Sequence, residues 1–261
     1  MALFSIDFYS TILGHETDLT VIVPEEKDIS DFSKKTEPYD TVYLLHGMGD
    51  NGSAWSRLSN IEHYANETGF LLVMPSAGHS FYTNAVYEKA WGTFFENELP
   101  YHVGKWFNLS DNKFIAGLSM GRFGAFKIGF KNLKQFKGIA GLSSVLSLVE
   151  LKNNAPSELK STINQVYKVI WGTENPNTSI HQLVKDVDAY CKYNNGPIIL
   201  HYCGLNDFLY GDNKRFMTEM KETRANYHFE EWEGGHEWGF WDEAIKKTLI
   251  LFREEVKNGK G

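Results

Sequence analysis

Short apolar runs alternate along the chain with longer amphipathic stretches. This alternation is typical of β-α units arranged around a mostly parallel sheet. The first two strands are expected to pair antiparallel, and the charged stretch 24–40 after them is expected to be a surface connection. The predicted strands are residues 4–13, 19–23, 42–45, 70–74, 112–116, 136–142, 198–203 and 227–232.

The stretch 143–181 fits this alternation poorly, because it has a polar start at 152–156 and a second polar segment at 175–177. We expect an insertion that lies over the sheet, without the long apolar face that covers a lipase site. No linker rich in Gly, Ser or Pro divides the chain. The sequence therefore predicts a single α/β domain over residues 1–261, with 143–181 as a cap-like insertion.

Composition narrows the classes of protein. The 261 residues are 42% hydrophobic, 15% aromatic and 23% charged, which is typical of a globular chain. The net charge is −7, so no nucleic-acid partner is expected, since such binding needs a basic face. No apolar run approaches the roughly 18 residues of a membrane span, and the N-terminus lacks the basic start of a signal peptide. Two cysteines do not make a disulfide scaffold, and we expect a cytoplasmic protein.

The strongest chemical signal is Gly117-Leu118-Ser119-Met120-Gly121, a G-x-S-x-G pattern between a predicted strand and a predicted helix. A serine on a sharp strand-to-helix turn brings backbone segments close together, so its neighbours must be small. The turn raises the serine hydroxyl above the sheet and aims the next amide at a developing oxyanion. The pattern also occurs by chance, but its place after a strand favours Ser119 as a nucleophile.

A serine hydroxyl needs a general base, and His236 is the candidate. It follows Gly234-Gly235 in the loop after the last predicted strand, where an imidazole can be exposed. The alternative is that His236 caps the last helix. Among the other histidines, His201 is expected in the core, whereas His181 and His228 are expected on the surface of a helix and a strand.

The candidate acid is Asp207, which follows the predicted strand 198–203 across a short turn. It would orient His236 and stabilise the imidazolium. Asp212 is the alternative, although it is expected to cap the helix 213–221 at its N-terminus.

The segment His46-Gly47-Met48-Gly49 follows an earlier strand, where the second half of an oxyanion hole is expected. The amides of Met48 and Met120 are the candidate donors. Residues 47–52 also satisfy G-x-G-x-x-G, but the next strand ends without the carboxylate that a dinucleotide ribose needs. No zinc-ligand spacing and no Walker A motif is present, so neither a metal nor a cofactor is expected.

Aromatic residues gather between 80 and 95. Phe94 and Phe95 are expected in the core, whereas Tyr82 can equally line a substrate pocket. The candidate substrate contacts are His46, Gly47, Tyr82 and Trp91.

Several segments together resemble the tributyrin esterase branch of the esterase D-like α/β-hydrolases, whose relatives are S-formylglutathione hydrolases and feruloyl and acetylxylan esterases. The resemblance covers nearly the whole chain. It implies Ser119, Asp207 and His236 as a triad, Met48 and Met120 as oxyanion donors, and the loop 81–83 as the substrate side. The segments are Leu44-Leu45-His46-Gly47-Met48, Phe114-Ile115-Ala116-Gly117-Leu118-Ser119-Met120-Gly121, Tyr202-Cys203-Gly204 with Asp207-Phe208-Leu209-Tyr210, and His236-Glu237-Trp238 with Trp241.

One position departs from this branch, which usually has a second glycine after the elbow where this chain has Arg122. A cation in the first turn of a helix is opposed by the helix dipole unless a carboxylate faces it. Arg122 is therefore expected either to be solvated or to pair with an acid from a neighbouring loop and fix the alcohol side of the pocket.

The residues and the resemblance together predict a serine carboxylesterase acting on short-chain acyl esters, with a small-molecule ester as its partner. One alternative is an S-formylglutathione hydrolase, a thioesterase with the same triad. The other is a hydrolase-fold binding protein without activity. The number of subunits is left open, and a homo-oligomer is compatible with the sequence.

Overall fold

The computed structural model describes residues 1–25 and 37–259, and these contain an eight-stranded sheet in the order β1-β2-β4-β3-β5-β6-β7-β8. β1 pairs antiparallel with β2, and β2 pairs antiparallel with β4. All other neighbours are parallel, so the predicted mixed sheet is confirmed. Most of the stretch 24–40, expected to be a surface connection, lies outside the described residues. The strands are β1 (Ala2–Ser10), β2 (His15–Val23), β3 (Tyr39–Leu45), β4 (Leu71–Pro75), β5 (Leu109–Leu118), β6 (Gly138–Leu142), β7 (Ile198–Gly204) and β8 (Tyr227–Trp232).

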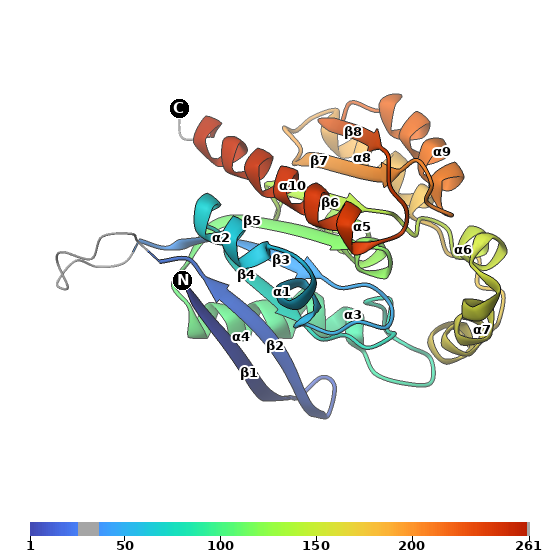
Figure 1. The fold of residues 1–261 in the computed structure, drawn as a ribbon, viewed down its shortest axis with the longest axis horizontal. Helices are drawn as coiled ribbons and strands as arrows, with labels where there is room; N and C mark the ends of the chain where they lie inside the picture. Colours follow the sequence, from blue (N-terminus) through green and yellow to red (C-terminus); the bar gives the residue numbers. More distant parts are fainter. Residues whose placement is uncertain (26–36, 260–261) are drawn as a thin grey trace.

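The central strands are apolar on both faces because helices cover both. Every residue of β4, β6 and β7 is buried. One face packs against α1, α2 and α10, and the other against α4, α5 and α9, as Figure 1 shows. The helices and helical turns are α1 (Ala54–Leu58), α2 (Ile61–Thr68), α3 (Trp91–Thr93), η1 (Phe94–Glu98), α4 (Leu99–Trp106), α5 (Met120–Lys131), α6 (Leu148–Asn154), α7 (Ser157–Trp171), η2 (Ile180–Leu183), α8 (Val184–Cys191), α9 (Tyr210–Lys221) and α10 (Trp238–Asn258).

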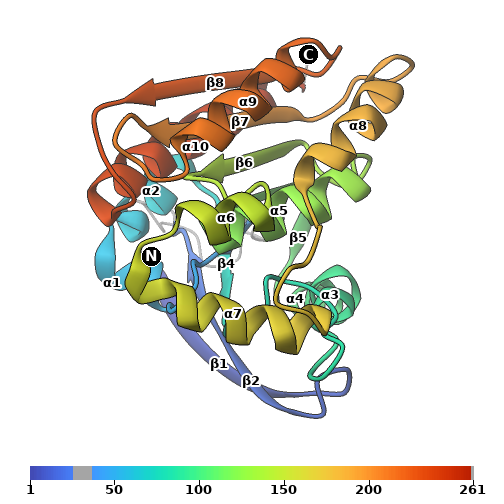
Figure 2. The same ribbon diagram turned by 90° about the vertical axis from the view of Figure 1, so that its right-hand side faces the viewer.

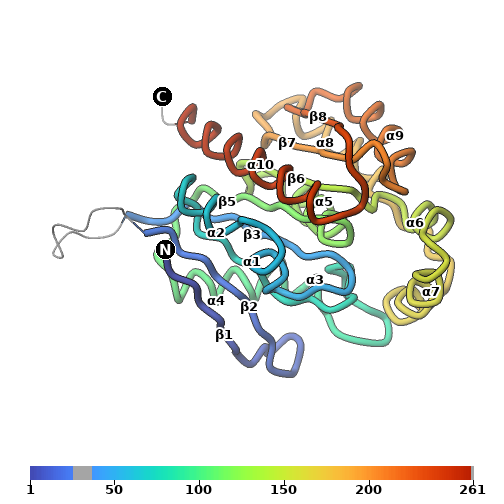
Figure 3. Tube along the Cα trace, in the orientation of Figure 1, coloured from blue at the N-terminus to red at the C-terminus, as the bar shows by residue number. Residues whose placement is uncertain are grey.

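The connection between β6 and β7 carries α6 and α7, which lie beyond the carboxyl ends of the parallel strands (Figures 1 and 2). In the view of Figure 3 the start of β1 and the end of α10 lie on the opposite side of the molecule from α6 and α7. The segment 143–181 was expected to lack the long apolar face that covers a lipase site, and the apolar stripe that it does carry packs into the core instead of lining the pocket. α7 buries a stripe at helical spacing, and that stripe packs against the rest of the protein; its members are Ile163, Val166, Tyr167 and Ile170.

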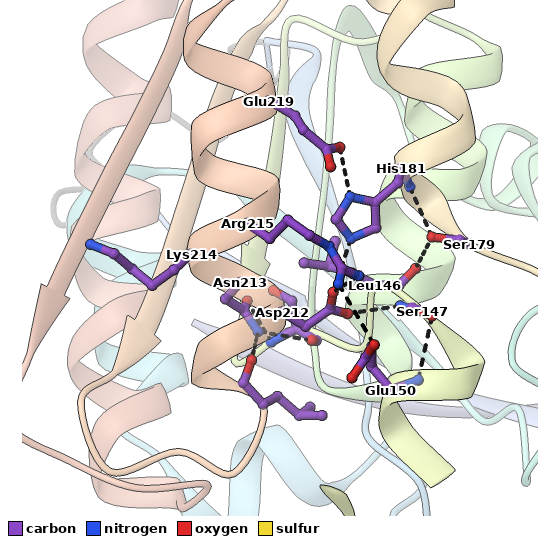
Figure 4. A network of polar contacts seen from close by, with 12 residues as sticks. Leu146, Ser147, Glu150, Ser179, His181, Asp212, Asn213, Lys214, Arg215 and Glu219 are labelled. Atoms are coloured by element: carbon purple, nitrogen blue, oxygen red, sulfur yellow. Dashed lines mark hydrogen bonds and ion pairs between the residues drawn. The ribbon is translucent and has the colours of Figure 1, made fainter. Parts of the chain in front are cut away.

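A polar network joins this segment to α9 and corrects two predictions (Figure 4). Asp212 does not cap α9; it lies in the first turn of the helix and is 5% exposed. One of its carboxylate oxygens accepts from the amide of Ser147 at 3.1 Å, and the other contacts Nε2 of His181 at 3.0 Å. His181, expected on a helix surface, is largely buried, and its Nδ1 lies 2.6 Å from a carboxylate oxygen of Glu219.

Because both ring nitrogens of His181 face carboxylates, the ring is best satisfied as an imidazolium, with both nitrogens donating. Burial alone lowers the pKa of His181, but the hydrogen bonds and charges of Asp212 and Glu219 outweigh it and raise the pKa above its ordinary value. Arg215 also contacts Asp212, at 2.5 Å, and Glu150, at 3.6 Å, so the network holds two cations and three carboxylates. The network therefore ties the β6–β7 connection to α9 most strongly when His181 is protonated.

We expect a His181→Gln variant to lose about 1–3 kcal/mol of unfolding free energy at pH 6, because the amide replaces only part of the charge-assisted pair. A raised folded-state pKa gives stability that is fully present below the unfolded pKa and is lost as pH rises through the folded value. The difference between parent and variant should therefore shrink from pH 6 to pH 9. Urea unfolding across this range tests the prediction, and a difference that does not change with pH would contradict it.

No helix in residues 1–25 and 37–259 combines the length and the apolar character that a bilayer crossing demands.

Candidate active site

Ser119 stands on the turn between β5 and α5, as the G-x-S-x-G pattern predicts. Its backbone is strained, with φ of 52° and ψ of −115°. A Cβ built on Gly117 would lie 2.4 Å from the backbone of Gly121, and one on Gly121 would lie 2.3 Å from the carbonyl oxygen of Leu45. Both glycines are therefore required by close backbone approaches. The strand runs two residues further than predicted and ends at Leu118.

The structure brings His236 and Asp207 to this serine. The Oγ of Ser119 lies 3.0 Å from Nε2 of His236, and Nδ1 of His236 lies 2.9 Å from Oδ2 of Asp207. A carboxylate can only accept, so Nδ1 carries the proton and Nε2 presents its lone pair to the serine hydroxyl. Asp207 is 5% exposed, and its other oxygen accepts from the amide of Leu209 at 2.8 Å.

The loops that carry Asp207 and His236 lie against each other. The amide of Asn206 donates to the carbonyl of Gly234 at 3.0 Å. A Cβ on Gly204 would lie 2.3 Å from that same carbonyl oxygen, so only glycine permits the approach. The rings of Phe208 and Trp241 lie 4.7 and 5.0 Å from the imidazole of His236, counted between centroids. Packing and hydrogen bonds thus fix the orientation of the imidazole.

Burial would raise the pKa of the Asp207 carboxyl, but the hydrogen bond and charge of His236 and the amide of Leu209 hold it below its ordinary value. Asp207 is therefore ionised at neutral pH and suited to stabilise an imidazolium. Asp212, the alternative acid, contacts His181 and Arg215 instead, and the structure does not bring it to His236. His201 is in the core as predicted and contacts Asn213 and Tyr227, while His228 is exposed on β8 as predicted.

Met48 and Met120 lie in the wall of the same pocket as the serine. Within the described ranges, no carbonyl or side chain accepts a hydrogen bond from either amide. Met120 is the first residue of α5, where the helix dipole also favours negative charge. Two unused amides near a nucleophile are suited to hold an oxyanion.

The pocket above Ser119 has a volume of about 120 Å³. Its wall is mainly apolar and comes from several elements, including the segment 143–181. Most of these residues carry no recognisable signal in the sequence, and the carboxylate among them, Asp50, was not among the predicted site residues. Besides Gly47, Met48, Ser119, Met120, Asp50 and His236, the wall consists of Phe81, Leu118, Val145, Leu151, Leu159, Phe208 and Trp241.

Three predicted substrate contacts do not line this pocket. The side chains of His46 and Tyr82 are fully buried, and Trp91 is 9% exposed, so that prediction is corrected for all three. The hydroxyl of Tyr82 instead donates to the carbonyl of His46 at 2.9 Å, and Nε2 of His46 accepts from the amide of Ala77. His46 and Tyr82 therefore connect the loop after β3 to the loop 77–82 through hydrogen bonds. Phe94 and Phe95 are in the core, as predicted.

The neighbour of Tyr82, Phe81, reaches the pocket because the loop is held in an unusual conformation. Phe81 and Tyr82 both have positive φ, 47° and 53°. The ammonium of Lys127 donates to the carbonyl of Tyr82 and to the hydroxyl of Thr83, each at 2.6 Å. Gly124 leaves room for the Tyr82 ring, since a Cβ there would lie 2.4 Å from it. α5 thus positions both Ser119 and Phe81 in the wall of the pocket.

Arg122 was expected either to be solvated or to pair with an acid, and it does neither. It is fully buried, and no carboxylate in the described residues forms an ion pair with it. Its guanidinium carbon lies 3.8 Å from the centre of the Phe126 ring, and one nitrogen contacts Asn213 at 3.4 Å. A Cβ on Gly141 would lie 2.0 Å from Nε, so Gly141 makes the space that the arginine fills. Burial lowers the pKa of Arg122 to about 9.

A mostly parallel sheet with helices on both faces and a Ser-His-Asp constellation at the carboxyl ends of its strands is the arrangement of α/β-hydrolase-fold enzymes. Nothing in residues 1–25 or 37–259 groups three or more His, Cys, Asp or Glu side chains as a metal site requires.

Comparison with known proteins gives the family. The model of the putative esterase family matches residues 10–252, and the chain belongs to that family. It is 32% identical over 262 residues to an acetyl esterase of Caldicellulosiruptor saccharolyticus, covering 95% of this chain and 97% of the relative. The chain is a carboxylic ester hydrolase.

Solved structures of serine hydrolases are similar to this chain over nearly its whole length. The fluorophosphonate-binding serine hydrolase FphF of Staphylococcus aureus superposes with a TM-score of 0.82 at 30% identity, over 97% of this chain and 98% of that one. The S-formylglutathione hydrolase FrmB of Staphylococcus aureus gives a TM-score of 0.80 at 30% identity, with the same coverage. The α/β-hydrolase fold is therefore confirmed.

Proposed function

We propose that the protein is a serine carboxylesterase that hydrolyses short-chain acyl esters through an acyl-enzyme intermediate. The observation that carries the proposal is the continuous hydrogen-bonded series from Ser119 through His236 to Asp207, at 3.0 and 2.9 Å. Similarity to an acetyl esterase and to a fluorophosphonate-binding serine hydrolase supports it.

In the proposed mechanism, the Oγ of Ser119 attacks the acyl carbon while Nε2 of His236 takes its proton. The oxyanion accepts hydrogen bonds from the amides of Met48 and Met120. His236 then protonates the departing alcohol, and a water molecule repeats the sequence on the acyl-enzyme. Asp207 keeps the imidazole in the productive tautomer and stabilises its charged form. No cofactor takes part in these steps.

The size of the pocket leads to a prediction about acyl chain length. A space of about 120 Å³ holds roughly four groups of the size of a water molecule. We therefore expect acetyl to butyryl p-nitrophenyl esters to be cleaved well, with kcat/KM falling for acyl chains longer than about eight carbons, which cannot be buried. A panel of p-nitrophenyl esters with acyl chains of roughly two to twelve carbons tests this prediction, because it includes chains that are too long to be buried. Strong activity on emulsified long-chain triglyceride would contradict it.

S-formylglutathione hydrolysis is the second candidate, because FrmB superposes over nearly the whole chain. The same triad can cleave a thioester, so the discriminating quantity is the ratio of kcat/KM values. S-formylglutathione and p-nitrophenyl acetate should be compared on one enzyme preparation. A kcat/KM for S-formylglutathione well above those of all short oxygen esters would favour the thioesterase.

A further inference from the structure

Asp50 is the only carboxylate in the wall of the active-site pocket as far as the described residues go, and His236 is the only other ionisable side chain there apart from the serine. It lies at the end of the loop that carries Met48. The amide of Asp50 donates to the carbonyl of Gly47 at 3.2 Å, and Gly49 between them has φ of +94°. This turn holds the Asp50 side chain on the pocket side.

The carboxylate is close to the reacting atoms. A Cβ built on Gly47 would lie 3.4 Å from Oδ2 of Asp50 and 3.6 Å from Cβ of Ser119, so the two side chains lie within about 7 Å of each other. Cδ1 of Leu118 lies closer still to that position, at 2.6 Å, so an apolar group adjoins the space between the two side chains. A substrate bound at Ser119 therefore occupies the pocket that Asp50 also lines.

Asp50 has no ion-pair partner in the described part of the chain, and its carboxylate accepts a hydrogen bond from the backbone amide of Gly47. Burial raises the pKa of Asp50, while the charge of Arg57 and the amide of Gly47 lower it by less. At pH 8, well above the ordinary range of a carboxyl group, Asp50 is ionised. No ion pair neutralises its charge, so the charge also acts on a substrate in the pocket.

We propose that Asp50 makes this pocket selective for charge: it favours esters whose alcohol part carries a positive charge or hydrogen-bond donors, and it disfavours esters with an anionic alcohol part. This inference rests on the proposed esterase function. Opposite charges attract and like charges repel across a partly desolvated pocket, where the effective dielectric constant is well below that of water. At separations of about 5–10 Å, one unit charge changes kcat/KM by roughly 3- to 30-fold.

Three acetate esters of similar size test the proposal at pH 8. Acetylcholine carries a cation, 3,3-dimethylbutyl acetate has the same shape without charge, and 3-sulfopropyl acetate carries an anion. For the parent enzyme we expect kcat/KM to decrease in that order. In Asp50→Asn the ratios of both charged esters to the neutral ester should move toward one, by roughly 3- to 30-fold. Ratios are used because they cancel any common effect on the oxyanion.

Asp7→Asn is the matched control, because it removes the same charge from an exposed position on the edge strand β1. It should leave all three kcat/KM values unchanged. Asp50→Ser gives a second neutral variant if Asp50→Asn does not fold. Equal ratios in the parent and the folded Asp50 variant would overturn the proposal for Asp50 alone. Failure of the parent to hydrolyse even the neutral ester would instead contradict the proposed esterase function.

Discussion

Replacement of Ser119 or His236 with alanine is expected to lower kcat on short-chain esters by about 10⁴- to 10⁶-fold. Ser119→Ala removes the nucleophile, and His236→Ala removes the group that takes its proton at 3.0 Å. The two losses should not add in the double variant, because the residues act as one unit. Steady-state turnover of p-nitrophenyl acetate measures the effect, with circular dichroism as the check on folding. A folded Ser119→Ala protein with near-parent turnover would contradict the proposed nucleophile.

The second large effect is expected for Asp207→Asn, which should lower kcat by about 10³- to 10⁴-fold. The amide is neutral, so it no longer stabilises the imidazolium, and its NH₂ group facing Nδ1 favours the wrong tautomer of His236. The loss arises in the chemical step, so it should appear in kcat more than in KM.

Asp212→Asn is the control for this change, because Asp212 is equally buried but contacts His181 and Arg215. It should lower the free energy of unfolding and leave kcat near the parent value. Loss of turnover in Asp212→Asn together with near-normal turnover in Asp207→Asn would move the acid to Asp212.

The sequence predicted the sheet and the grouping of Ser119, Asp207 and His236 because both depend on local patterns. Apolar runs between turn-forming residues identify buried parallel strands. A Cβ at position 117 or 121 would lie only 2.4 or 2.3 Å from backbone atoms, so glycine is required at both and five residues suffice to identify the elbow. The order of a serine, an acid and a histidine after successive strands then identifies Asp207 and His236 as the partners of Ser119.

The pocket wall was harder to predict, because it depends on long-range packing. Tyr82 and Phe81 are adjacent aromatic residues, yet only Phe81 faces the pocket, and the choice is made by two positive φ angles and a contact from Lys127. The apolar stripe of α7 at helical spacing was present in the sequence and could have been found. Asp50 could also have been singled out, since it lies two residues after Met48.

The prediction for Arg122 failed for a different reason. A charged residue is rarely buried without a partner, so solvation or an ion pair was the reasonable expectation. The structure places it over the ring of Phe126 in space left by Gly141, which is 19 positions further along the chain. A cavity made by a distant glycine leaves no signal near the arginine in the sequence.

The most direct test of the account is covalent labelling of the nucleophile. The parent protein is treated with a fluorophosphonate probe and analysed by intact-protein and peptide mass spectrometry. We expect one label per chain, on Ser119, which is absent in Ser119→Ala and is prevented by prior incubation with excess butyryl ester. A folded parent protein that takes up no label, or takes it up on a residue other than Ser119, would contradict the account.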